Sequence, residues 1–175
     1  MSSPDPEQTG FTESQRAGIE RRRFDQDRTL DAMQRLEQAL GAAAPRREAE
    51  WRREVLASLA VLDEAAREEA ANASRPDSLL SDISRTQPWL RNRVRALRAH
   101  YDQLQHRIGE LRGEMETPAA GLGDASVDVA AVRRRLASVL TALRQQRARE
   151  SDLIYEAYYD AFHVDLAPRQ QGGAE

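Results

Sequence analysis

The sequence predicts an all-α protein: an antiparallel four-helix bundle with a short extra helix between its second and third long helices. Three observations lead to this fold class. Ala, Arg, Leu and Glu dominate the 175 residues, and all four are good helix formers. Apolar residues recur in steps of three and four along four long segments, as a helix packed on one face requires. Pro and Gly interrupt these segments too often for two long separate coiled coils, so one bundle domain is expected.

The first long helix is expected from Glu13 to Leu40, between a polar tail and a break rich in Gly, Ala and Pro. The tail, residues 1–12, is predicted to be disordered because it is polar and contains Pro and Gly. The inward face of the helix is expected to comprise Ile19, Arg23, Gln26, Leu30, Met33, either Leu36 or Glu37, and Leu40.

The second long helix is expected from Arg46 to Ala73, and Pro76 separates it from the next apolar segment because Pro cannot continue a helix. Its inward face is expected to comprise Trp51, Val55, Leu59, Leu62, Ala66 and Glu69. A short apolar turn or helix then contains Leu79, Leu80 and Ile83.

The third long helix has the clearest pattern, and Pro88 is expected in its first turn. Strict three-four steps predict an inward face of Leu90, Val94, Leu97, Tyr101, Leu104, Ile108, Leu111 and Met115.

The fourth long helix is expected from Val129 to Phe162, after a loop over residues 117–128 that contains Pro and Gly. Its inward face is expected to comprise Val129, Val132, Leu136, Val139, Leu143, Gln146, Glu150, either Leu153 or Ile154, Ala157 and Phe162. Residues 13–166 are therefore predicted to form a single domain, and residues 167–175 a second disordered tail.

Composition excludes several classes of protein. The chain has 26 basic and 29 acidic residues and a formal charge of −3, which argues against a nucleic-acid partner. It has no Cys, so a disulfide framework, a thiolate metal site and a Cys nucleophile are excluded. No apolar run has the length of a membrane span, and the polar start is unlike a signal peptide. We therefore expect a cytoplasmic protein without a membrane partner.

Polar residues stand at several positions where the helical pattern expects apolar ones. They are Gln26, Glu69, Tyr101 and Gln146, one on each long helix, and Glu150 adds a second carboxyl group on the fourth. A buried polar group without a partner costs about 1–3 kcal/mol, so such residues usually have a reason to be there. Three interpretations remain open: a position near a bundle end or a face misread by one residue, a hydrogen-bonded polar layer, or a site for a metal or small ligand.

Three stretches resemble the hemerythrin-like, or HHE-type, bundles of bacteria. They run from Asp25 to Leu40, from Arg75 to Tyr101 and from Arg144 to Asp165, in matching order and spacing. The resemblance implies a four-helix bundle that holds a di-iron centre through histidines of all four helices and bridging carboxylates. Members of this family bind or sense oxygen, redox state or iron.

The same resemblance implies that this chain has lost the iron ligands. The expected histidines fall on Gln26, Glu69, Tyr101 and Gln146, and none of these residues is His. Glu69 could still coordinate iron well, Tyr101 could do so only when deprotonated, and a Gln side chain is a weak ligand. The resemblance therefore implies the fold and argues against the activity.

No other motif predicts a metal site or a catalytic centre. His100 and His106 lie on different faces of one helix, and the chain contains no Glu-x-x-His or His-Glu-x-x-His motif and no phosphate-binding glycine loop. His163 follows Asp160 at i+3 near a helix end, and each histidine is expected to be solvated or to cap a helix. We therefore predict no enzyme, no metal and no cofactor.

Two kinds of surface are candidates for protein contacts. The clusters Arg21–Arg23 and Arg133–Arg135 are interleaved with acidic residues along the chain, which is typical of a solvated helix face, although they could also bind an acidic partner. The most aromatic segment contains Tyr155, Tyr158, Tyr159 and Phe162. These rings are expected either to close the open end of the bundle or to form an interface.

The sequence thus predicts a non-catalytic structural or protein-interaction module that self-associates or binds a protein partner. The alternative is a divergent metal-binding sensor of oxygen, redox state or iron, with Glu69, Tyr101 and Glu150 as ligands. A third option is a coiled-coil subunit whose third-helix stripe is buried between chains.

Overall fold

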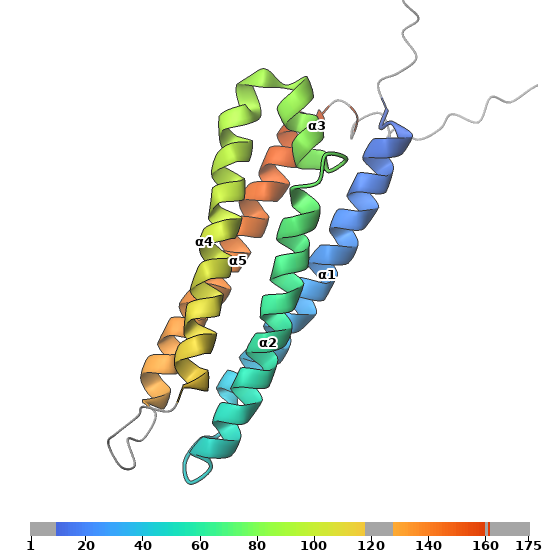
Figure 1. The fold of residues 1–175 in the computed structure, drawn as a ribbon. Coiled ribbons are helices and arrows are strands. Elements are labelled where there is room, and N and C mark those ends of the chain that lie inside the picture. The colour runs from blue at the N-terminus through green and yellow to red at the C-terminus, as the bar shows by residue number, and fades with distance from the viewer. Residues whose placement is uncertain (1–9, 118–127, 160, 162–175) are drawn as a thin grey trace, which may run out of the picture.

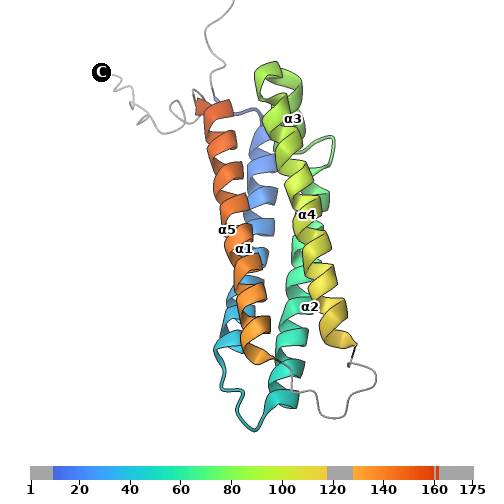
Figure 2. The ribbon, with the colours of Figure 1, turned by 90° about the vertical axis from the view of Figure 1, so that its left-hand side faces the viewer.

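The computed structural model describes residues 10–117, 128–159 and 161 of the chain. The described residues form helices and no strand, so the prediction of an all-α fold is confirmed for them. The elements are α1 (Glu13–Gly41), α2 (Glu48–Ala73), α3 (Leu79–Thr86), the 3-10 turn η1 (Pro88–Leu90), α4 (Arg91–Glu116) and α5 (Val129–Ala157). The four long helices lie side by side, each reversing the direction of the one before, and short α3 lies at one end (Figures 1 and 2).

The folded structure begins before residue 13. The Thr12 side chain accepts a hydrogen bond from the backbone N–H of Gln15, and the Gln15 side chain accepts one from the backbone N–H of Thr12, which makes a capping box. Phe11 is buried, and its ring packs edge-on against Tyr158 with centroids 5.7 Å apart. The predicted disorder is therefore wrong for Phe11 and Thr12, because an aromatic side chain beside a cap anchors the chain; residues 1–9 lie outside the described range.

The inward face of α1 differs by one position from the prediction in its first half. Asp25 and Thr29 are buried, whereas Gln26 is only half-buried and Leu30 is 39% exposed. The predicted face passes through Leu30 because it is apolar, but the helix turns its neighbour Thr29 inward. Arg23 is likewise exposed. The second half of the helix buries the predicted residues Met33, Leu36 and Leu40.

The start of α2 and the end of α5 differ from the prediction, whereas the start of α4 agrees with it. α2 begins at Glu48 rather than at Arg46, because Arg46 has a φ of 63°, in the left-handed region that a right-handed helix does not use. α5 ends at Ala157, and Phe162, where the sequence pattern ends the helix, lies outside the described residues. Pro88 opens η1 directly before α4, as its missing N–H predicts.

The core consists of two apolar clusters, one toward each end of the long helices. The larger cluster includes Leu36, Trp51, Leu59, Ile108 and Leu136, and it lies toward the end where α1 passes into α2. The smaller cluster lies beside α3 and includes Phe11, Leu80, Ile83, Leu97 and Leu153. The predicted inward face of α4 is buried from Leu90 to Met115, and this one face contributes residues to both clusters.

None of the helices within the described residues is both long enough and apolar enough to cross a membrane.

Candidate functional site

Polar side chains occupy the level between the two apolar clusters. On α2, Ala66 belongs to one cluster and Ala73 packs on the other, and Glu69 lies between them. On α4, Tyr101 lies between Leu104 and Leu97 in the same way. The residues of this level that contact one another are Thr29 of α1, Glu69 of α2, Tyr101 of α4 and Glu150 of α5, which we call the Tyr101 cluster.

The Tyr101 cluster is linked by hydrogen bonds from all four long helices. The Tyr101 hydroxyl donates to Oε2 of Glu150 over 2.9 Å, and its oxygen lies 3.3 Å from Oε1 of Glu69. The Thr29 hydroxyl donates to Oε2 of Glu69 over 2.6 Å. Each of the four residues is at most 6% exposed. Glu69, although near the end of α2, therefore lies at the same level as the other three.

Burial decides the protonation of this cluster. Burial raises the pKa of Glu69, the hydrogen bond from Thr29 opposes that rise, and the negative charge of Glu150 adds to it. Burial, and after it the negative charge of Glu150, raise the pKa of Tyr101 well above its usual value of 10.0. Tyr101 is therefore a neutral donor rather than a phenolate.

One proton arrangement that satisfies every contact has Glu69 protonated. A hydroxyl group has one proton to donate and lone pairs to accept with, so Tyr101 cannot donate to Glu150 and Glu69 at once. A protonated Glu69 can donate from Oε1 to the Tyr101 oxygen while Oε2 accepts from Thr29. The raised pKa of Glu69 favours this neutral form.

Glu150 is balanced by a cation at the edge of the cluster. Nε of Arg22 lies 3.4 Å from Oε1 of Glu150, and the Arg22 side chain is 22% exposed. With its amide oriented to suit its neighbours, Gln26 accepts a hydrogen bond from Nη2 of Arg22 over 2.6 Å. Gln26 thus contacts the cluster through Arg22 from a half-buried position, rather than as one of its buried members.

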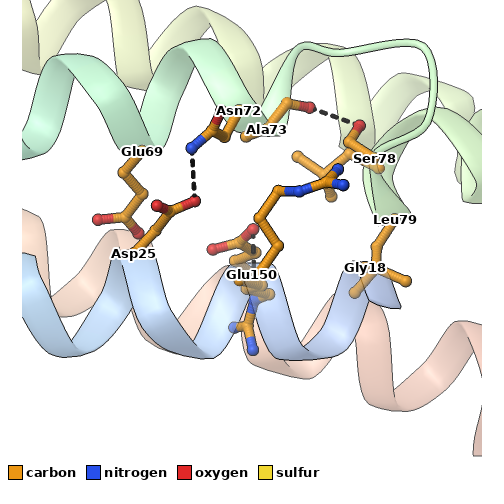
Figure 3. A pocket seen from close by; sticks show the side chains of 11 residues that line it. Gly18, Asp25, Glu69, Asn72, Ala73, Ser78, Leu79 and Glu150 are labelled. Carbon is orange, nitrogen blue, oxygen red and sulfur yellow. Dashed lines mark hydrogen bonds and ion pairs between the residues drawn. The ribbon is translucent and has the colours of Figure 1, made fainter. Parts of the chain in front are cut away.

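A small cavity beside the cluster extends toward α3, and its lining includes a third buried carboxyl group, that of Asp25 (Figure 3). Asp25 accepts a hydrogen bond from Nδ2 of Asn72 over 2.9 Å. The cavity has a volume of about 30 Å³, enough for about two water molecules, and its lining includes Glu69, Glu150 and the backbone of Gly18. Asp25 and Asn72 were not predicted from the sequence, because Asp25 is buried only in the corrected register of α1.

Gln146 is buried at this level but does not join the cluster. Its Nε2 donates to the backbone oxygen of Leu97 over 3.1 Å, and its Oε1 has no partner within the described residues. It lines an enclosed space of about 10 Å³ together with Tyr101 and Glu69, which is near the lower limit for one water molecule. Of the five predicted polar residues, the structure therefore joins Glu69, Tyr101 and Glu150 directly.

The residues of this level do not fit the di-iron centre that the family resemblance implies. Among the described residues, no three side chains of His, Cys, Asp or Glu come together as a possible metal site. The donors here are two carboxyl groups, a neutral phenol and an amide already bonded to a backbone carbonyl, with no imidazole. His106 is exposed and pairs with Glu110 on the same helix, and His163 lies outside the described residues.

The aromatic segment of α5 divides between core and surface. Tyr158 is 6% exposed and donates a hydrogen bond to Oδ2 of Asp82 over 2.7 Å, which fits the first of the two alternatives for this segment, a ring that closes the end of the molecule. Tyr155 and Tyr159 are 51% and 49% exposed, and their rings form an edge-to-face pair. Phe162 lies outside the described residues.

Arginines of both basic clusters bind other parts of the fold. Arg133 donates to the backbone oxygens of Leu40 and Ala42 at the end of α1, and its guanidinium lies 5.6 Å from the centre of the Trp51 ring. Arg21 pairs with Asp77. Side chains that the sequence pattern assigns to a solvated face or a docking surface are thus used within the fold.

Comparison of the chain with protein-family models, with curated proteins and with solved structures finds no match in any of the three.

Proposed function

We propose that the chain is a non-catalytic structural or protein-interaction module, built on an antiparallel four-helix bundle of the hemerythrin-like type that has lost di-iron binding. The arrangement of the long helices around two apolar clusters supports the bundle. The order and spacing of the three resembling stretches support the family. The chemistry of the buried polar groups supports a non-catalytic role.

The hydrogen bond from Tyr101 to Glu150 is the observation that carries this proposal. In a metal site, these side chains would present free oxygen atoms toward one point. Here the phenol keeps its proton and shares it with the carboxylate in a hydrogen bond, while Thr29 donates to Glu69. Polar groups that satisfy one another within a core fix how helices pack, so the cluster supports a structural role.

An exposed group of aromatic side chains supports the interaction role. Trp89, Tyr155 and Tyr159, which we call the aromatic end, are 71%, 51% and 49% exposed. They lie at one end of the molecule, since Gln87 donates to the backbone oxygen of Ala157 and Arg93 pairs with Glu156. Exposed Trp and Tyr side chains are enriched at the centres of protein interfaces. The aromatic end therefore suits contact with a partner protein or a second copy of the chain.

The experiment compares variants of the aromatic end with a matched surface variant. Trp89→Ala and the double variant Tyr155→Ala/Tyr159→Ala are compared with Phe24→Ala, which removes another aromatic side chain, 63% exposed, from α1. Light scattering gives the mass in solution, and affinity capture gives the partner. Loss of an interface anchor typically weakens binding by about 2 kcal/mol or more, whereas Phe24→Ala should change neither readout. If all three proteins behave like the parent, the aromatic end is not an interface.

A metal-binding sensor is the second candidate, and the convergence of Glu69, Tyr101 and Glu150 favours it. Tyr101 joins the two carboxyl groups at 3.3 Å and 2.9 Å, so three oxygen atoms lie close together. A phenol binds iron as phenolate, however, and the raised pKa of Tyr101 opposes its deprotonation. The metal content of the protein separates this candidate from the first.

A further inference from the structure

A groove of about 220 Å³ between α4 and α5 is separate from the aromatic end and from the small cavity that Asp25 lines. Its polar lining includes His100 of α4 and Gln146, Arg149 and Asp152 of α5, and its apolar lining includes Leu97 and Leu153. The volume is below the range of about 300–1,000 Å³ that is typical for drug-sized ligands. The groove therefore suits a smaller molecule.

Two residues that line this groove each have a buried polar atom without a partner among the described residues. The Leu97 carbonyl can only accept, so the hydrogen bond from Nε2 fixes the Gln146 amide and leaves Oε1 without a donor within the described residues. The Gln146 side chain is 1% exposed. Nε2 of His100 is also buried and has no hydrogen-bond partner among the described residues. Because leaving such atoms unsatisfied costs free energy, a ligand that donates to Gln146 gains an interaction that the protein alone lacks.

Two exposed residues of opposite charge, Arg149 and Asp152, line the same groove. Within the described part of the chain, neither makes a hydrogen bond or an ion pair. Arg93, in contrast, is paired with Glu156. Residues three apart on a helix lie on the same face, about 5–6 Å apart at Cβ. The groove thus presents one cation and one anion, close together, over an apolar floor.

We propose that this groove binds a free α-amino acid with an apolar side chain. The ligand carboxylate pairs with Arg149, and its ammonium group donates to Asp152 and to Oε1 of Gln146. Its side chain covers Leu97 and Leu153. A zwitterion meets all of these groups at once, whereas a simple anion leaves Asp152 and Gln146 without a donor. The proposal does not depend on the interaction role of the aromatic end.

The test is a titration of the full-length protein, followed by NMR of the Gln146 side-chain amide and the His100 ring. The probes are leucine, leucinamide, which lacks the carboxylate, and 4-methylpentanoate, which lacks the ammonium group. We expect leucine to shift both signals with a Kd of roughly 1 mM or lower, and the two analogues to bind at least about ten-fold more weakly. Absence of a shift with leucine at roughly 10 mM, or equal binding of the analogues, would overturn the proposal.

Variants of exposed residues give an independent test that does not endanger folding. Arg149→Gln and Asp152→Asn should each weaken leucine binding by about ten-fold, because each removes one charged partner. Arg134→Gln, the same change at another exposed position of α5 without an ion pair among the described residues, should leave the Kd unchanged. Equal loss of affinity in the Arg134 and Arg149 variants would show a general charge effect and would overturn the assigned site.

Discussion

The hydroxyl of Tyr101 lies 2.9 Å from Oε2 of Glu150, and this contact joins α4 to α5 at the level between the two apolar clusters. The same oxygen lies 3.3 Å from Oε1 of Glu69, so one phenol connects three helices. A buried phenol that bridges two carboxyl groups makes the stability of the fold sensitive to the removal of one oxygen atom and to the protonation of Glu69.

The first prediction concerns the loss of that oxygen atom. Tyr101→Phe keeps the ring and its packing but leaves Glu150 without its hydroxyl donor in a buried site. We expect the free energy of unfolding to fall by about 1–3 kcal/mol, the usual cost of an unsatisfied buried acceptor. Urea unfolding at neutral pH measures this change in the free energy of unfolding. Tyr155→Phe, which removes the hydroxyl of a half-exposed ring, serves as the control and should cost much less. An equal, small effect in both variants would mean that the Tyr101 bond contributes nothing.

The second prediction concerns the protonation of Glu69. The pKa of Glu69 is raised in the folded protein, so its contribution to stability is fully present below the unfolded pKa of about 4.5 and is lost as pH rises through the folded pKa. Glu69→Gln imitates the protonated form, since its amide can donate to Tyr101 and accept from Thr29. At low pH the free energy of unfolding of the variant should lie within about 1 kcal/mol of that of the parent. As pH rises, the variant should become the more stable protein.

Unfolding by urea at several values between pH 4.5 and about pH 8 measures this difference. Glu64→Gln makes the same change at an exposed position of α2 and is the matched control. The difference in free energy of unfolding between Glu64→Gln and the parent should change much less with pH than the difference between Glu69→Gln and the parent. Parallel pH profiles of the parent and Glu69→Gln would contradict a raised pKa at Glu69.

The third prediction concerns iron. Tag-free protein from cells grown with added iron should contain far less than one iron per chain and show no visible charge-transfer band. The physical reasons are the neutral phenol of Tyr101 and the amide of Gln146 that is bonded to Leu97. Metal analysis and an absorption spectrum measure both. A content of roughly one iron per chain would favour the sensor, and Glu69→Gln should then remove the metal.

Much of the fold follows from local signals in the sequence. The three-four spacing on α4 predicts every buried apolar residue from Val94 to Met115, because a helix packed on one side must repeat at that interval. The start of α4 is predicted within a few residues by the proline before it, and the end of α2 by the Pro-containing break after it. In the first half of α1 the same rule fails, because the helix buries Thr29, which bonds to Glu69, and leaves Leu30 39% exposed.

The candidate site was predictable only in part. Polar residues at apolar positions indicated Glu69, Tyr101 and Glu150, because departure from a regular pattern is itself a signal. Which of these residues contact one another depends on how far each helix is shifted along its axis and rotated about it. The spacing of residues in the sequence does not encode either quantity. Asp25 and Asn72 give no signal, since their pairing joins residues 47 positions apart. The groove beside His100 likewise depends on how α4 and α5 pack.

The last prediction concerns the contact that closes the end of the molecule near α3. Asp82 of α3 accepts hydrogen bonds from the Tyr158 hydroxyl over 2.7 Å and from Nε2 of Gln15 over 3.0 Å, so it ties α3 to α5 and α1. Burial acts to raise the pKa of Asp82, but the hydrogen bonds from Gln15 and Tyr158 and the charge of Arg85 outweigh it and hold that pKa below 3.8. Its contribution to stability is therefore present above the unfolded pKa and is lost as pH falls through the folded pKa.

Asp82→Ala should lower the free energy of unfolding by about 1–3 kcal/mol at neutral pH, because the Tyr158 hydroxyl keeps its buried place and loses its acceptor. The difference from the parent should shrink as pH falls from 3.8 through the lower folded pKa of Asp82, because the folded parent then loses the charged form as well. Tyr158→Phe in the Asp82→Ala background should add little further loss, because both changes remove the same bond. Additive effects of the two substitutions would show that the hydrogen bond does not hold α3 to α5.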